Sequence, residues 1–174
     1  QYVKEHTNSA IWIDANEAWS ESEFMHIMPE LARLGVTLVE QPLHRDDWEG
    51  MQAVYTKRNE AVQLIADESC QHLTDIARVA TCFDGANIKL AKCGGITPAL
   101  SMMQALKKEQ KKIMLGTMSE SMPVACATAQ LAPVADFVDV DAPLLLENKI
   151  GHGLNINNEG LYSFSSPIGI GYRM

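Results

Sequence analysis

Short apolar runs alternate with longer amphipathic stretches along most of the chain. The runs are rich in β-branched and aliphatic residues, which is typical of strands buried on both faces of a parallel sheet. Their carboxyl ends lie 22 to 28 residues apart, about one strand plus one helix. Such a series predicts an α/β fold, either a (β/α)-barrel or an open doubly wound sheet. The predicted strands are residues 10–14, 37–40, 62–67, 86–90, 112–117 and 137–141.

The stretch between the first two runs carries the clearest helix signals. Ser20 and Glu23 have the spacing of a capping box, and apolar residues then recur at helical spacing until Gly35. Pro29 interrupts this pattern, because proline removes a backbone donor and clashes with the preceding turn. The sequence therefore predicts a helix that begins after Ser20 and is kinked or broken early at Pro29.

Other boundaries follow from single residues. Asp46 or Asp47 is expected to cap a helix, Thr97 another with Pro98 at its first position, and Ser121 an alanine-rich one. Near the end of the chain, residues 154–164 predict a small hairpin, which turns at Asn157-Asn158-Glu159-Gly160.

Composition narrows the class of protein without giving a function. The chain has 174 residues, is 47% hydrophobic and has a formal net charge of −8. This acidic balance argues against a nucleic-acid partner and against binding to an anionic membrane. The four cysteines show no metal-ligand spacing, which is typical of free thiols in a reducing compartment. We expect a cytoplasmic globular protein.

Charged residues end most of the apolar runs, where a buried charge would be costly unless it had a use. In a barrel, all parallel strands deliver their carboxyl ends to one mouth, where active sites lie. An acid at such a turn often only caps the next helix. Three successive acids followed by a lysine are better explained by an oxygen-only site for Mg²⁺, or Mn²⁺. The three acids are Asp14, Glu40 and Asp67, and the lysine is Lys89. Two more acids, Asp139 and Asp141, lie at the end of the last strand.

Two lysines lie near the end of the fourth run, Lys89 within it and Lys92 just after it. A lysine beside a bound dication is pushed towards its neutral form, which a general base needs. Lys89 is therefore the candidate catalytic base, and Lys92 is expected to support it. The alternative for either residue is an ordinary solvated or ion-paired lysine.

Four short motifs occur in order along the chain, namely Ile13-Asp14-Ala15-Asn16, Glu40-Gln41-Pro42, Asp67-Glu68-Ser69, and Asn87-Ile88-Lys89-Leu90 with Gly94-Gly95. Together they resemble the muconate-lactonising subgroup of the enolase superfamily. The resemblance covers essentially the whole chain. It implies a TIM-like (β/α)-barrel, of which this chain would hold the last six βα units.

The resemblance also implies roles for individual residues. Asp14, Glu40 and Asp67 would bind Mg²⁺, Asn16 and Glu68 would orient them, and Lys89 would be the base. Within the subgroup, the segment from Asp139 to Leu144 resembles dipeptide epimerases, in which Asp139 and Asp141 would hold the substrate's α-ammonium group. Thr117, in a segment similar to the seventh strand of the family, would line the substrate pocket.

The implied activity is Mg²⁺-dependent removal of the proton α to a carboxylate, giving an enediolate and epimerising a dipeptide. Cycloisomerase or o-succinylbenzoate synthase-like lyase chemistry of the same superfamily is an alternative, although those substrates bring no ammonium for Asp139 and Asp141. A non-catalytic metal-binding fragment or scaffold is the alternative from another class.

One half of the expected machinery falls before residue 1. A Lys-x-Lys pair on the second barrel strand should supply the acid/base group for the opposite face of the substrate, and only thirteen residues precede Asp14. We therefore expect the first two strands and the capping domain to be missing, so that the chain needs an N-terminal segment. Residues 1–150 would form the partial barrel, and residues 151–174 a tail directed towards the capping domain. A homo-oligomer is an open alternative.

Overall fold

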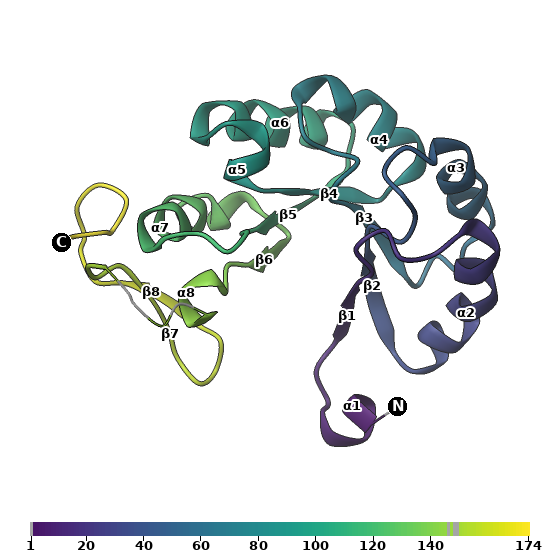
Figure 1. Ribbon diagram of the computed structural model, residues 1–174, viewed down its shortest axis with the longest axis horizontal. Coiled ribbons are helices and arrows are strands. Elements are labelled where there is room, and N and C mark those ends of the chain that lie inside the picture. The colour runs from purple at the N-terminus through teal and green to yellow at the C-terminus, as the bar shows by residue number, and fades with distance from the viewer. Residues whose placement is uncertain (1, 146, 148–149) are drawn as a thin grey trace. The chain divides into compact units, whose positions relative to one another are not determined.

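The computed structural model describes residues 2–145, 147 and 150–174 (Figure 1). Six strands follow one another in chain order as neighbours in one sheet, and the first four pair in parallel, as do the last two. All six predicted runs are confirmed as strands, and the α/β class with them. The strands are β1 Ile11–Asp14, β2 Val36–Glu40, β3 Gln63–Ala66, β4 Gly85–Ile88, β5 Lys112–Gly116 and β6 Phe137–Asp139.

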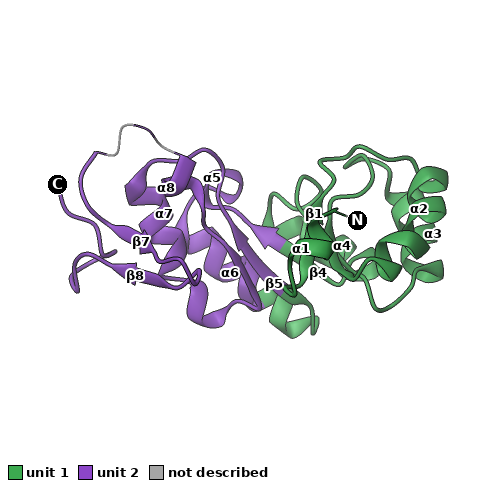
Figure 2. Cartoon of the chain, turned by 90° about the horizontal axis from the view of Figure 1, so that it is seen from below, with its two compact units in different colours: residues 1–86, 105–112 green, residues 87–104, 113–174 purple. Residues whose placement is uncertain are grey.

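The chain divides into two compact units, coloured separately in Figure 2. Unit 1 comprises residues 1–86 and 105–112, and unit 2 comprises residues 87–104 and 113–174. Strands β1 to β3 lie in unit 1, and β6 lies in unit 2.

Unit 1 is a layer of parallel strands with helices packed on it (Figure 1). Helix α2 packs on β2 and on α3, and α3 packs on α4. The side chains between these layers are fully buried, including Phe24, Val39, Val54 and Leu64. The helices are α1 Tyr2–His6, α2 Glu21–Arg33, α3 Trp48–Lys57 and α4 Ile76–Cys82, with the 3-10 turn η1 Leu73–Asp75 before α4.

Helix α2 begins as its sequence predicts. The Ser20 hydroxyl accepts a hydrogen bond from the Glu23 N–H, and the Glu23 carboxylate accepts one from the Ser20 N–H, which completes the capping box. The expectation of an early break at Pro29 is wrong, because the helix runs on to Arg33. Pro29 has no N–H to donate to the carbonyl of Met25, but Pro29 is exposed, so water can hydrate that carbonyl. The buried Phe24 and Met28 hold the helix on the core.

Of two further predicted helix starts, one is confirmed and the other is displaced by one residue. Asp47 is the N-cap of α3 and accepts a hydrogen bond from the Gly50 N–H at 2.9 Å. Helix α6, Ile96–Lys108, begins one residue before the predicted cap Thr97. The reason is Gly95, which has a φ of +118° and whose carbonyl accepts the first helical hydrogen bond, from Ala99.

Unit 2 has its own core, built around α7, Met122–Ala129, with Ser121 as its N-cap as predicted. Leu154 packs against α7 from the strand β7, Leu154–Ile156, which pairs antiparallel with β8, Tyr162–Phe164. This confirms the predicted hairpin, whose turn includes Gly160 at a φ of +78°. The shorter elements are α5 Leu90–Cys93, α8 Ala142–Leu145 and the 3-10 turn η2 Ala132–Val134.

Across the described part of the chain, every helix is too short or too polar to cross a bilayer.

Candidate active site

The three predicted metal ligands lie at one end of the sheet in unit 1. Asp14 is the register partner of Glu40 on the neighbouring strand, and Glu40 is in turn the partner of Ile65. Asp67 lies two residues beyond Ile65, so the alternation of side chains along a strand directs it to the same face as Glu40. The chain therefore brings Asp14, Glu40 and Asp67 to the carboxyl ends of three adjacent parallel strands.

These carboxylates differ in exposure. Glu40 and Asp67 are 4% and 3% exposed, whereas Asp14 is exposed. Within the described residues, no three Asp, Glu, His or Cys side chains are arranged closely enough to hold a metal ion. The donor chemistry nevertheless fits a hard cation, because all three groups supply carboxylate oxygens only. The ligand roles remain predictions.

Glu68 shows how much negative charge gathers at this end of the sheet. Burial raises the pKa of Glu68, and the negative charges of Asp67, Glu17 and Asp14 raise this pKa further. Its Oε2 atom is buried and has no hydrogen-bond partner among the described residues. Such a cluster disfavours ionisation and would be stabilised by a cation.

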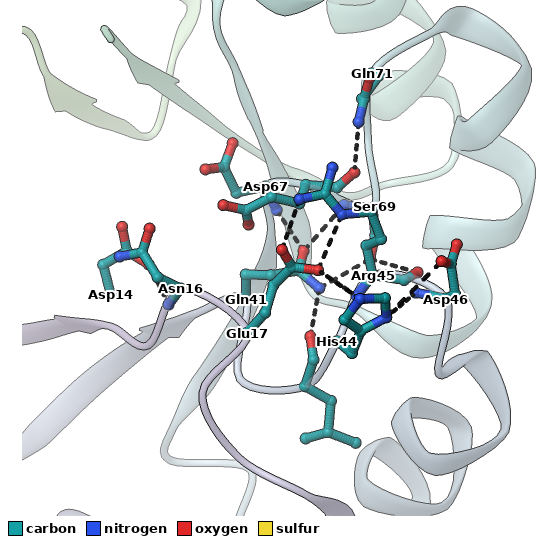
Figure 3. Close-up of polar contacts among 12 residues, drawn as sticks. Asp14, Asn16, Glu17, Gln41, His44, Arg45, Asp46, Asp67, Ser69 and Gln71 are labelled. Carbon is teal, nitrogen blue, oxygen red and sulfur yellow. Dashed lines mark hydrogen bonds and ion pairs between the residues drawn. The ribbon is translucent and has the colours of Figure 1, made fainter. Parts of the chain in front are cut away.

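A hydrogen-bonded network joins the loops that follow the three strands (Figure 3). The Gln41 carboxamide contacts Asp67 and Ser69 on the β3 loop, and the Ser69 hydroxyl donates to the Arg45 carbonyl. Arg45 then forms a bidentate ion pair with Glu17, its Nη2 atom lying 2.6 Å from Glu17 Oε2. This ion pair lowers the pKa of Glu17, although burial partly opposes the effect.

Backbone strain is concentrated on the same loops. Asn16, Glu17 and Gln41 have φ angles of +45°, +63° and +34°, a region that non-glycine residues rarely adopt. The Asn16 N–H donates to Asp14 Oδ1 at 2.9 Å, and the Glu17 N–H donates to the Gln41 carbonyl at 2.9 Å. Such strain persists where surrounding contacts hold it, and it often occurs at functional sites.

The predicted base lies in unit 2. Lys89 follows β4 directly, precedes α5 and is only 8% exposed. The Lys92 ammonium donates to the Asn87 carbonyl at 3.0 Å, so Lys92 fastens the end of the strand that carries Lys89. Burial raises the pKa of the Glu120 carboxyl, and the positive charge of Lys89 is among the smaller effects that partly offset this.

A largely apolar cavity of about 710 Å³ opens beside the segment after Lys89. Leu90 and Ala91 line one side of it, Glu120 and Ser121 another. Thr117, the predicted pocket residue, is partly buried, and its hydroxyl has no hydrogen-bond partner within the described ranges. The cavity can accommodate an apolar group next to a carboxylate.

Asp139 and Asp141 are both exposed, and Val140 between them is fully buried. This alternation puts both carboxylates on the solvent side of the strand end. The Val140 N–H donates to the Tyr162 hydroxyl at 3.2 Å, which ties the segment to the C-terminal hairpin. Burial raises the pKa of Tyr162, and the negative charges of both aspartates raise it further.

Several of these residues were not singled out by the sequence analysis. Gln41 stands in a quoted motif, but its contacts span 26 and 28 residues and give no local signal. The Glu17–Arg45 pair likewise spans 28 residues. Tyr162 lies in the predicted hairpin. The alternation of apolar residues there predicts that its side chain is buried, but not which residues it contacts. Glu120 follows the predicted Thr117 by three residues.

The chain resembles known proteins over its whole length. The family model described as Enolase C-terminal domain-like matches residues 1–174. The L-Ala-D/L-amino acid epimerase of Maribacter sp. (strain HTCC2170 / KCCM 42371) is 43% identical over 172 residues, and that of Flavobacterium johnsoniae is 40% identical over 172 residues. Each match covers 99% of this chain and 50% of the relative, so the chain spans about half the length of these curated proteins.

Solved structures of dipeptide epimerases also match this chain. The dipeptide epimerase from Enterococcus faecalis V583, complexed with Mg and the dipeptide L-Leu-L-Tyr, matches with a TM-score of 0.88 and 31% identity over 95% of this chain and 48% of that one. The L-Ala-D/L-Glu epimerase from Bacillus subtilis matches with a TM-score of 0.86 and 29% identity over 94% and 47%. These matches confirm the predicted (β/α)-barrel class and the predicted family resemblance.

Proposed function

Because the chain belongs to the enolase C-terminal domain-like family, we propose that it contributes to a Mg²⁺-dependent dipeptide epimerase. The reaction is the removal and return of the proton α to the substrate's carboxylate. The observation that carries the proposal is the alignment of Asp14, Glu40 and Asp67 at adjacent strand ends, in a chain similar to named epimerases.

Asp14, Glu40 and Asp67 would hold the cation, and Asn16 and Glu68 would keep the ligand-bearing turns in place. When bound, Mg²⁺ stabilises the negative charge that develops on the substrate's carboxylate, which makes the α-proton more acidic. The buried position of Glu40 and Asp67 limits competing hydration of the two carboxylates. Mn²⁺ has the same ligand preferences and would substitute.

Lys89 would accept the α-proton of one epimer on its Nζ atom, and it would deliver a proton to that same face when the other epimer is the substrate. Lys89 is buried at the end of β4, where an amine can meet a bound substrate with little competition from water. Epimerisation needs a second acid/base group on the other face of the α-carbon. That group is expected before residue 1, and the curated relatives are about twice as long as this chain.

Asp139 and Asp141 would bind the ammonium group of the dipeptide. Both are exposed on one side of the strand end, so a cation can reach them without displacing a packed side chain. A dipeptide brings one ammonium group and one carboxylate, which match these acids and the metal site. A cycloisomerase substrate would bring no such cation.

The test is turnover of L-Ala-L-Glu by the full-length protein with Mg²⁺, followed by chiral chromatography for L-Ala-D-Glu. We expect epimerisation that EDTA abolishes, and a loss of about tenfold or more in kcat/KM for Asp141→Asn. The N-acetylated dipeptide, which lacks the ammonium, should be a poor substrate for both proteins. Mg²⁺ binding without turnover of any dipeptide would contradict the proposal and favour the scaffold alternative.

A further inference from the structure

We propose that Gln41 is a positioning residue that fixes the segment carrying Asp67, and thereby sets the affinity of the site for a divalent cation. This inference rests on the proposed ligand role of Asp67. Gln41 is fully buried, directly follows Glu40, and contacts the loops that carry the other two predicted ligands.

The side chain of Gln41 uses both of its polar ends. Its Oε1 atom accepts hydrogen bonds from the N–H groups of Asp67 at 2.9 Å and Ser69 at 3.1 Å. Its Nε2 atom donates to the Leu43 carbonyl at 2.9 Å and to the Ser69 hydroxyl at 2.8 Å. The reverse orientation of the amide would face two N–H donors with an NH₂ group, so the partners themselves fix its direction.

The main chain of Gln41 completes the connection. Its N–H donates to the Ile65 carbonyl at 2.9 Å, and its carbonyl accepts from the Glu17 N–H at 2.9 Å. Glu17 lies three residues after Asp14, so one residue is bonded to the segments that follow β1 and β3 while being adjacent to Glu40. The φ of +34° at Gln41 is the strained conformation that permits these contacts.

Because Gln41 already holds the turn that carries Asp67 in place, cation binding does not have to pay the entropy cost of ordering it. Without the Gln41 side chain, the Asp67 and Ser69 N–H groups would lose their buried acceptor, and the turn would relax to recover hydrogen bonds elsewhere. Partners of this kind typically change metal affinity about 10- to 100-fold when removed. A role in folding alone would instead lower stability and leave the affinity of the folded protein unchanged.

Three variants of the full-length protein separate these roles. Gln41→Met keeps the length of the side chain and removes its hydrogen bonds. Gln41→Glu keeps the acceptor for the Asp67 and Ser69 N–H groups and loses the donor to the Leu43 carbonyl and the Ser69 hydroxyl. Gln63→Met is the matched control, because Gln63 stands at the other end of β3 and its side-chain oxygen is buried without a hydrogen-bond partner among the described residues.

Isothermal titration with MgCl₂ measures the dissociation constant, and thermal unfolding measures stability. We expect the constant to rise at least about tenfold in Gln41→Met, to rise less in Gln41→Glu, and to stay at the wild-type value in Gln63→Met. In activity assays, excess Mg²⁺ should restore much of the kcat of Gln41→Met.

Wild-type affinity in a folded Gln41→Met protein would overturn the inference. If that variant does not fold, a Gln41→Glu protein with an affinity as weak as that of Asp67→Asn would overturn it instead, because the retained acceptor would then have no effect. A wild-type protein that binds no Mg²⁺ would refute the proposed function itself.

Discussion

Asp14 and Glu40 are register partners on neighbouring parallel strands, yet Asp14 is exposed and Glu40 is buried. The same end of the sheet therefore exposes one carboxylate to solvent and buries the other. Asp67 and Glu68 follow the third strand directly, so negative charges repel one another at a place where a cation would stabilise them all.

This crowding predicts a specific response to Asp14→Asn. Without metal, the variant should unfold at the same temperature as the wild type or slightly above it, because one repelling charge is gone. Added Mg²⁺ should raise the unfolding temperature of the wild type and have much less effect on the variant. Calorimetric scans with and without Mg²⁺ measure both values. An equal Mg²⁺-induced rise in the two proteins would remove Asp14 from the ligand set.

The Glu17–Arg45 ion pair predicts a stability difference that depends on pH. Its hydrogen bonds lower the pKa of Glu17 below the ordinary 4.5. The stabilisation is therefore complete above about pH 4.5 and is lost as pH falls through the lowered value. Glu17→Gln should reduce the free energy of unfolding by about 1 kcal/mol at pH 7, since Arg45 is partly exposed, and by progressively less in acid.

Urea denaturation at pH 7 and pH 3 checks this expectation. Glu30→Gln is the control, because the Glu30–Arg33 pair is similar in geometry but exposed on both sides and screened by solvent. A Glu17→Gln effect that is the same size at both pH values would show that packing, and not the charge pair, accounts for it.

The hydrogen bond between Tyr162 and Val140 joins the C-terminal hairpin to the segment between the two aspartates, and we expect it to contribute to the stability of the fold. Tyr162→Phe removes the acceptor of the Val140 N–H and should cost about 1–3 kcal/mol, the range for a buried donor left without a partner. Tyr172→Phe, whose exposed hydroxyl donates to the Ile150 carbonyl, should cost less. Urea titrations of both variants make the comparison, and equal losses would contradict it.

The sequence predicts the strands well and the helices unevenly, for physical reasons. Strands buried on both faces need continuous apolar runs, so residues such as Val39 and Leu64 mark them without any tertiary knowledge. Helix α4 is not predicted, because it is short and its N-cap Asp75 makes no side-chain cap hydrogen bond. The helix through Pro29 shows burial overriding a local breaker.

For the site, the sequence supplies the residues at strand ends and not the contacts that hold them. The positions of Asp14, Glu40 and Asp67 follow from the regular spacing of strands. The role of Gln41 could not follow in this way, since its partners are distant in sequence and are brought together only when β2 and β3 pair. The exposure of Asp14 likewise depends on what surrounds the end of β1.

Deuterium exchange at the α-carbon shows whether Lys89 moves the substrate's α-proton in a Mg²⁺-dependent reaction. The full-length wild type and Lys89→Met are incubated with L-Ala-L-Glu, and separately with L-Ala-D-Glu, in ²H₂O with MgCl₂. Proton NMR follows the Glu α-proton. We expect Lys89→Met to abolish epimerisation and to lose exchange from one epimer, while Mg²⁺ affinity stays measurable. Unchanged deuterium incorporation from both epimers in Lys89→Met would contradict this expectation.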